Sequence, residues 1–139
     1  MKKSLGIVAI LLLLGISGRA QTNATGVKNN YVVSTTKIPQ LQPIILTAEA
    51  LKEEDGERFG DFQIVMYGSN VKELTDKGAM EKYTGKAKAA GVEIFVCKIS
   101  LDRLGIDPDN LHEYIKVVDH AYTYLIQLQK NKNYYSLQL

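Results

Sequence analysis

The segment Gly91-Val92-Glu93-Ile94-Phe95-Val96-Cys97 predicts a buried strand with a thiol at its carboxyl end. Its residues are almost continuously apolar, which is typical of a parallel strand covered on both faces. In open parallel sheets, ligands and chemistry gather beyond the carboxyl ends of the strands. Cys97 is the only cysteine of the chain, so it cannot form an intramolecular disulfide. It is therefore an apolar filler, an intermolecular link or a reactive sulfur.

Strand and helix patterns alternate on both sides of this segment. The further strands are predicted at 31–36, 61–67, 116–119 and, at an edge, 134–137, and the helices at 38–54, 71–75, 79–90, 110–115 and 121–130. Such alternation favours a parallel sheet with helices on both faces. We therefore expect a three-layer α/β/α sandwich with a mainly parallel sheet of four or five strands. The strands 31–36, 61–67 and 92–97 should be central.

The first 20 residues predict a secretory signal peptide. A basic start at Lys2-Lys3 precedes an apolar run from Leu5 to Ile16, and Gly18-Arg19-Ala20 supplies the small residues of a cleavage site. The apolar run is short for a membrane span, which needs about 20 residues. We expect cleavage after Ala20 and no stable membrane insertion, with an uncleaved N-terminal anchor as the alternative.

Cleavage would leave a flexible N-terminal segment at 21–30 and one domain at 31–139 in the periplasm or outside the cell. The full chain has 17 basic and 15 acidic residues and a net charge of +2. Lys2, Lys3 and Arg19 leave with the signal, which changes the net charge to −1. No run of five or more basic residues remains, so nucleic-acid binding is disfavoured.

The thiol segment also resembles a known family. The span Lys88 to Cys97, followed after seven residues by Gly105-Ile106, is similar to the signature of the DsrE/DsrF-like sulfur-relay family. Tyr67-Gly68 resembles the end of that family's second strand, and Val117-Val118 with the terminal tyrosines resembles its small exported branch.

The resemblance implies a three-layer α/β/α domain that forms a homo-oligomer, such as a trimer or a hexamer. It also implies that Cys97 accepts sulfane sulfur as a persulfide and exchanges it with a donor or acceptor protein. Two features depart from the relay members, which are cytoplasmic. This chain carries a predicted export signal, and its stretch Lys98 to Leu104 lacks the run of small residues common there.

Other candidate residues follow the ends of the predicted strands, at the same edge of the sheet as Cys97. The predicted binding residues are Thr36, Gly68, Ser69, Asn70, Lys98, Ser100 and His120. Gly68 allows a ligand to approach the backbone closely. Backbone N–H groups near Ser100 would favour a thiolate if a helical turn opens there. His120 suits a base or a proton shuttle near neutral pH.

The sequence indicates neither a metal site nor a cofactor. Its two histidines and one cysteine lack the spacing of metal ligands, and His112 is expected to be exposed on a short polar helix. Two functions remain open. One is a periplasmic sulfur carrier or persulfide transferase that uses Cys97. The other is a non-enzymatic oligomeric module that binds a small ligand or a partner, with Cys97 only packing.

Overall fold

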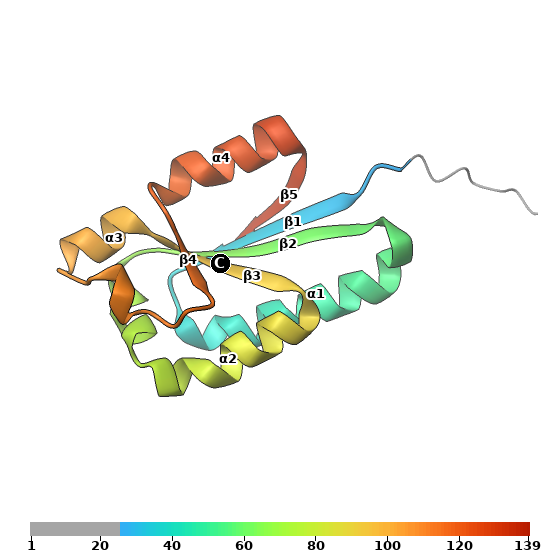
Figure 1. Ribbon diagram of the computed structural model, residues 1–139. Coiled ribbons are helices and arrows are strands. Elements are labelled where there is room, and N and C mark those ends of the chain that lie inside the picture. Colours follow the sequence, from blue (N-terminus) through green and yellow to red (C-terminus); the bar gives the residue numbers. More distant parts are fainter. Residues whose placement is uncertain (1–25) are drawn as a thin grey trace, which may run out of the picture.

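The computed structural model describes residues 26–139, which form a five-stranded sheet with helices on both faces (Figure 1). The strands are β1 (Asn29–Thr35), β2 (Phe59–Met66), β3 (Val92–Cys97), β4 (Ile115–Val118) and β5 (Tyr134–Gln138). Their order is β4-β3-β2-β1-β5, and every neighbouring pair is parallel. The predicted α/β/α sandwich is confirmed, with β1, β2 and β3 in the centre.

Two helices cover one face of the sheet and a third covers the other. The helices are α1 (Leu41–Asp55), α2 (Lys77–Ala90), α3 (Lys98–Arg103) and α4 (Ala121–Lys132), and short 3-10 turns occupy Ile38–Gln40, Gly56–Arg58, Ser69–Thr75 and Pro108–Asn110. Figure 1 shows α1 and α2 on one side and α4 on the other. Because β4 and β5 are opposite edges of the sheet, α4 crosses it between them.

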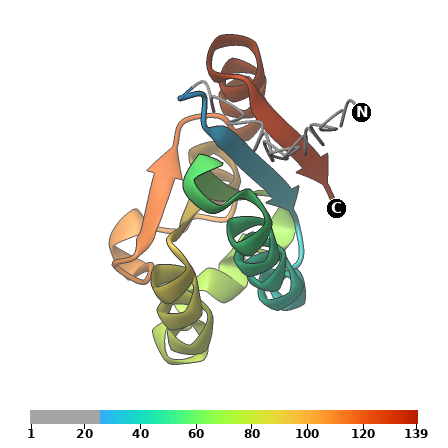
Figure 2. The same ribbon diagram turned by 90° about the vertical axis from the view of Figure 1, so that its right-hand side faces the viewer.

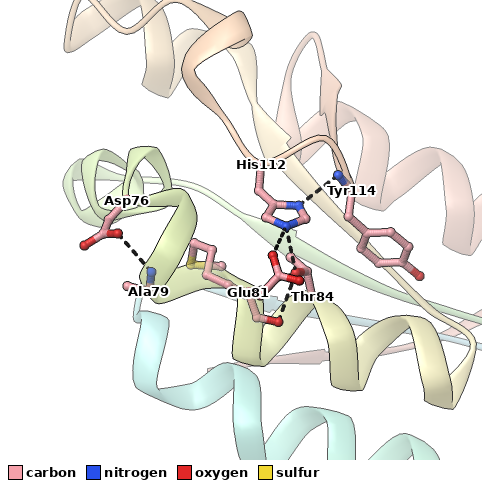
Figure 3. Close-up of polar contacts among 7 residues, drawn as sticks. Asp76, Ala79, Glu81, Thr84, His112 and Tyr114 are labelled. Atoms are coloured by element: carbon pink, nitrogen blue, oxygen red, sulfur yellow. Dashed lines mark hydrogen bonds and ion pairs between the residues drawn. The ribbon is translucent and has the colours of Figure 1, made fainter.

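Local sequence explains the ends of α2. The Asp76 carboxylate accepts the Ala79 N–H at 2.9 Å and caps the start of the helix (Figure 3). Gly91 ends it in a left-handed conformation with φ of 75°, which only glycine adopts at little cost. The chain therefore turns directly from α2 into β3 and brings Cys97 to the carboxyl end of the sheet.

The predicted helix at 110–115 is wrong. The structure has a single 3-10 turn at Pro108–Asn110, in which the Asp107 side chain accepts the Asp109 N–H at 3.0 Å. The chain then extends at Leu111 and enters β4 at Ile115. The Asp-Pro-Asp sequence satisfies its own backbone as a turn, so it does not propagate a longer helix.

His112 is also placed differently from the sequence prediction, since it packs against α2 (Figure 3). Its Nε2 lies 2.9 Å from Glu81 Oε2 and 3.2 Å from Thr84 Oγ1. Its Nδ1 accepts the Tyr114 N–H at 3.1 Å, which assigns the ring proton to Nε2 in this arrangement. The side chain is only 14% exposed, and these contacts join the segment before β4 to α2.

The predicted signal peptide at 1–20 and the next residues up to 25 lie outside the described residues. β1 begins at Asn29, two residues earlier than predicted. The Asn30 side chain explains part of this extension, because its Oδ1 accepts the Asp61 N–H at 2.9 Å where the register with β2 shifts. Between residues 26 and 139, no helix has both the length and the apolar character that a membrane span requires.

Candidate functional site

A cavity of about 300 Å³ lies at the carboxyl ends of β2 and β3. Its walls come from the residues after β2, from α3 and from the start of α4. Cys97 lines it from β3, and Gly68 and Ser69 line it from the segment after β2. Ala121 and Tyr122 of α4 close another side. The cavity therefore occupies the position where open parallel sheets hold their ligands.

Cys97, the last residue of β3, is buried against the first turn of α4. It is a free cysteine with 4% of its surface exposed. Its Sγ accepts the backbone N–H of Ala121, the first residue of α4, at 3.3 Å. The sulfur therefore contacts one of the N–H groups at a helix start, which carry partial positive charge.

Gly68 shapes the cavity wall after β2. Its backbone, at φ 85° and ψ −170°, lies in a region open almost only to glycine. The Gly68 N–H donates to Ser100 Oγ at 2.9 Å, which joins the end of β2 to α3. A Cβ at this position would lie 3.3 Å from Cγ2 of Thr36. The glycine thus allows three segments to meet beside the thiol.

Comparison with known proteins assigns the chain to a family. The DsrE/DsrF-like family model matches residues 44–137, which include the cavity and Cys97. The chain belongs to the DsrE/DsrF-like family. The resemblance found in the sequence is thereby confirmed. No curated protein matches the chain.

Two solved structures show the same fold as this DsrE/DsrF-like chain. The protein of unknown function MTH1491 from Methanobacterium thermoautotrophicum is 19% identical, with a TM-score of 0.60 over 81% of this chain and 99% of its own. The conserved protein of unknown function BT1422 from Bacteroides thetaiotaomicron is 16% identical, with a TM-score of 0.62 over 84% of this chain and 100% of its own. At these identities the likeness concerns the fold alone.

The structure brings five of the eight predicted site residues to the cavity. These are Gly68, Ser69, Cys97, Ser100 and His120. The cavity thus combines the sulfur with a hydroxyl-bearing wall and one imidazole. The His120 ring lies 5.5 Å from that of Tyr122, and its Nδ1 is 2.9 Å from Thr123 Oγ1.

The other three predicted residues do not line the cavity. Thr36 and Asn70 support its wall from behind, because Asn70 Nδ2 donates to the Thr36 carbonyl oxygen at 2.9 Å. Lys98 forms an ion pair with Asp102 at 2.7 Å. The hydrogen bond and charge of Asp102 raise the pKa of Lys98 above its usual value. Lys98 is therefore paired on the surface of α3 and is not among the residues that line the cavity.

The sequence prediction missed four lining residues, which are Ile99, Arg103, Leu104 and Tyr122. Tyr67, at the end of the second predicted strand, also borders the cavity. Tyr67 and Tyr122 meet edge to face with ring centres 5.3 Å apart. The α3 residues follow the spacing of one helix face, so a helix predicted directly after Cys97 would have found them.

Arg103 is the one lining residue whose side chain carries a permanent positive charge. No aspartate or glutamate lines it, and among the described residues no carboxylate forms an ion pair with Arg103. The wall therefore joins one guanidinium and one imidazole to apolar and aromatic surface, a combination that suits a small anion or an anionic group of a partner. Within residues 26–139, no group of three or more His, Cys, Asp or Glu side chains is arranged to hold a metal ion.

Proposed function

We propose that this DsrE/DsrF-like protein is a sulfur carrier in which Cys97 holds a persulfide. One observation carries the proposal: the only thiol of the chain borders a cavity and receives a helix-start N–H on its sulfur. The cavity leaves room for an added sulfur atom and for part of a donor. The N–H favours the anionic sulfur that such chemistry needs.

The transfer needs no oxidant. The Cys97 thiol first loses its proton to solvent or to His120, and the thiolate then attacks the outer sulfur of a donor persulfide. A new S–S bond forms at Cys97 Sγ, the S–S bond of the donor breaks, and the donor leaves as a thiolate. An acceptor thiolate removes the outer sulfur by the same reaction and returns Cys97 to its thiolate.

Arg103 would attract the donor. Persulfides and the thiolates that they release are anions, and Arg103 is the one cationic side chain with a fixed charge on the cavity wall. The apolar rim formed by Ile99, Leu104 and Tyr122 would cover the reacting sulfurs. The same features suit either a small organic persulfide or the persulfide-bearing loop of a donor protein.

Location and partners form part of the same proposal. The basic and apolar pattern of residues 1–20 supports export to the periplasm, or secretion. In that compartment the protein would exchange sulfur with a donor or acceptor protein and would act as a homo-oligomer.

Intact-mass spectrometry tests the proposal. The purified chain is treated with inorganic polysulfide, desalted and weighed with and without dithiothreitol. We expect a mass gain of one or more sulfur atoms that dithiothreitol removes, and no gain for Cys97→Ser. A thermal melt of Cys97→Ser provides the control for folding. Absence of any gain in the folded wild-type protein would contradict the sulfur-carrier proposal.

The 4% exposure of Cys97 favours a second candidate, the oligomeric binding module in which the cysteine only packs. In that case Cys97→Ser buries a hydroxyl in place of a thiol and should lower the free energy of unfolding by about 1–3 kcal/mol. Such a loss, together with no sulfur uptake by the wild type, would favour the binding module. Sulfur uptake by the folded wild type would favour the carrier.

A further inference from the structure

Among residues 26–139, strand β5 is a free edge of the sheet. Within this part of the chain it pairs only with β1, and the Leu139 N–H donates to the Ser34 carbonyl oxygen at 2.9 Å. Backbone groups of successive strand residues point alternately to the two sides of a strand. Those of Tyr135 and Leu137 therefore face β1, as Leu139 does, and those of Ser136 face away from the sheet. The outer side of β5 thus presents a row of unpaired N–H and C=O groups.

The same strand carries an uncovered apolar strip. Tyr135, Leu137 and Leu139 alternate along the chain and are 62%, 52% and 46% exposed. The Tyr135 ring stacks at 5.5 Å on Tyr31, which packs against the core under α1 and α2, so the strip lies on that face. Figure 2 shows β5 at the margin of the sheet, with α1 and α2 over the neighbouring strands.

The sequence of β5 lacks the features that usually protect a free edge. Charged side chains and prolines discourage edge-to-edge pairing, yet residues 133–139 contain neither. The opposite edge, β4, has only four residues and carries Lys116, which pairs with Glu93 of β3. An uncharged strand with open backbone groups and half-exposed apolar side chains fits a partner strand.

We propose that β5 pairs with β5 of a second copy of this chain, antiparallel about a two-fold axis at Ser136. In this register Ser136 faces Ser136 of the second copy, and Tyr134 faces Gln138. Tyr135 then lies opposite Leu137, and Leu137 opposite Tyr135, at the positions where cross-strand side chains approach most closely. Both copies contribute the same pair, and no like charges meet.

The lack of charged side chains along β5 favours a second copy as the partner. A two-fold contact brings the same residues of both copies together, so a charged side chain beside the axis would meet its like, and residues 133–139 contain none. The two five-stranded sheets would join into one continuous sheet, with the apolar strips of both copies adjacent. The proposal concerns assembly, and it holds or fails independently of the chemistry of Cys97.

Analytical ultracentrifugation of the full chain at micromolar concentration, with and without a substitution at Ser136, tests this interface. Ser136→Pro removes the outward N–H and leaves the β1-facing groups of Tyr135 and Leu137 in place. We expect a dimer, or a larger even-numbered assembly, for the wild type and for Ser136→Ala, and half that mass or a monomer for Ser136→Pro. A monomeric wild type, or an assembly equally stable in both variants, would overturn the proposal.

A charge pair tests the register and guards against misfolding of the proline variant. Leu137→Glu alone should give a folded monomer, as judged by circular dichroism. Tyr135→Lys combined with Leu137→Glu should restore the assembly, because each lysine would face a glutamate of the other copy. A folded double variant that stays monomeric would overturn the register. Protection of the outward-facing Ser136 amide from hydrogen exchange in a monomer would assign the edge to another segment of the same chain and overturn the proposal.

Discussion

The two ends of the parallel sheet are closed in different ways. At the amino end, Tyr31 and Asn29 of β1 both donate to Asp55 at the end of α1, at 2.6 and 2.8 Å. The Tyr31 ring also stacks on Phe59. At the carboxyl end, Cys97 borders a cavity of about 300 Å³. At the amino end the polar side chains bond to one another, whereas at the carboxyl end polar side chains line a cavity.

The difference separates stability from chemistry. Burial, then the hydrogen bond to Asp55, raises the pKa of Tyr31 to about 12. The same hydrogen bond lowers the pKa of Asp55. These groups satisfy one another and leave little to bind a ligand. Arg103 and His120 face the cavity instead. Substitutions at the amino end should therefore change stability alone, whereas those around the cavity should also change sulfur uptake.

The largest effect on stability is expected for Gly68→Ala. The alanine would have to adopt φ 85° and would approach Thr36, so the free energy of unfolding should fall by about 1–3 kcal/mol. Displacement of the wall should also slow sulfur uptake by Cys97. Urea denaturation and the intact-mass assay measure the two effects.

Gly85→Ala is the matched control. Gly85 lies within α2, and no atom lies within 4 Å of a Cβ added there. The alanine should raise the free energy of unfolding by about 0.5–1 kcal/mol and leave uptake unchanged. If both alanine variants behaved alike, the wall after β2 would have no special role.

His112→Ala should follow in size. The substitution leaves the Tyr114 N–H without its acceptor and releases Glu81 and Thr84 on α2. We expect the free energy of unfolding to fall by about 1–3 kcal/mol with unchanged sulfur uptake. Hydrogen exchange should show the loss at the turn before β4. Reduced uptake at unchanged stability would contradict a purely structural role.

Tyr31→Phe should lower the free energy of unfolding by about 1–2 kcal/mol, because it removes the hydroxyl that donates to Asp55. The stability that Asp55 confers is present above its ordinary pKa of 3.8 and is lost as the pH falls through its lowered value. The stability that Tyr31 confers is present below its ordinary pKa of 10.0 and is lost as the pH rises toward its raised pKa of about 12.

Denaturation of wild type and Tyr31→Phe from acid to alkaline pH measures these contributions. The difference in free energy of unfolding between the two proteins should be largest between the ordinary pKa values of Asp55 and Tyr31, 3.8 and 10.0. It should shrink at more acidic and at more alkaline pH. A difference that does not depend on pH would show that the hydroxyl acts only through packing. Sulfur uptake near neutral pH should be the same for both proteins.

The smallest stability change is expected for His120→Ala. The His120 side chain makes no capping bond to α4, and its residue is exposed, so the free energy of unfolding should change by less than about 0.5 kcal/mol. If His120 takes the thiol proton, sulfur uptake by Cys97 should be slower in His120→Ala than in the wild type. Equal rates of uptake in the two proteins would exclude that role.

The sequence predicts the layers of this fold well because β1, β2 and β3 each contain a run of buried residues and alternate with helices. It fails where long-range contacts decide. His112 is held by Glu81 and Thr84, which lie 31 and 28 residues away, and no local pattern reveals that contact. The turn at Pro108–Asn110 is a different case, because the local hydrogen bond from the Asp109 N–H to the Asp107 side chain favours a single turn over the predicted helix.

The candidate site was found in part for similar reasons. Cys97 and Gly68 follow apolar strands, so their place at the carboxyl end of the sheet can be deduced from the strand pattern. Arg103 and Tyr122 reach the cavity only because α3 begins directly after Cys97 and α4 returns over the same end. That return depends on the crossing of α4 between the two edge strands, which the sequence pattern does not specify.

A structure of the polysulfide-treated protein tests the sulfur-carrier role of Cys97, since it would show where the added sulfur lies. We expect density for a second sulfur bonded to Cys97 Sγ and directed into the cavity between Gly68 and Tyr122. The Ala121 N–H should remain beside the sulfur, with α3 and α4 in place. A protein that stays unmodified while folded, or that carries the added sulfur only with α4 displaced, would contradict persulfide formation by Cys97 in this cavity.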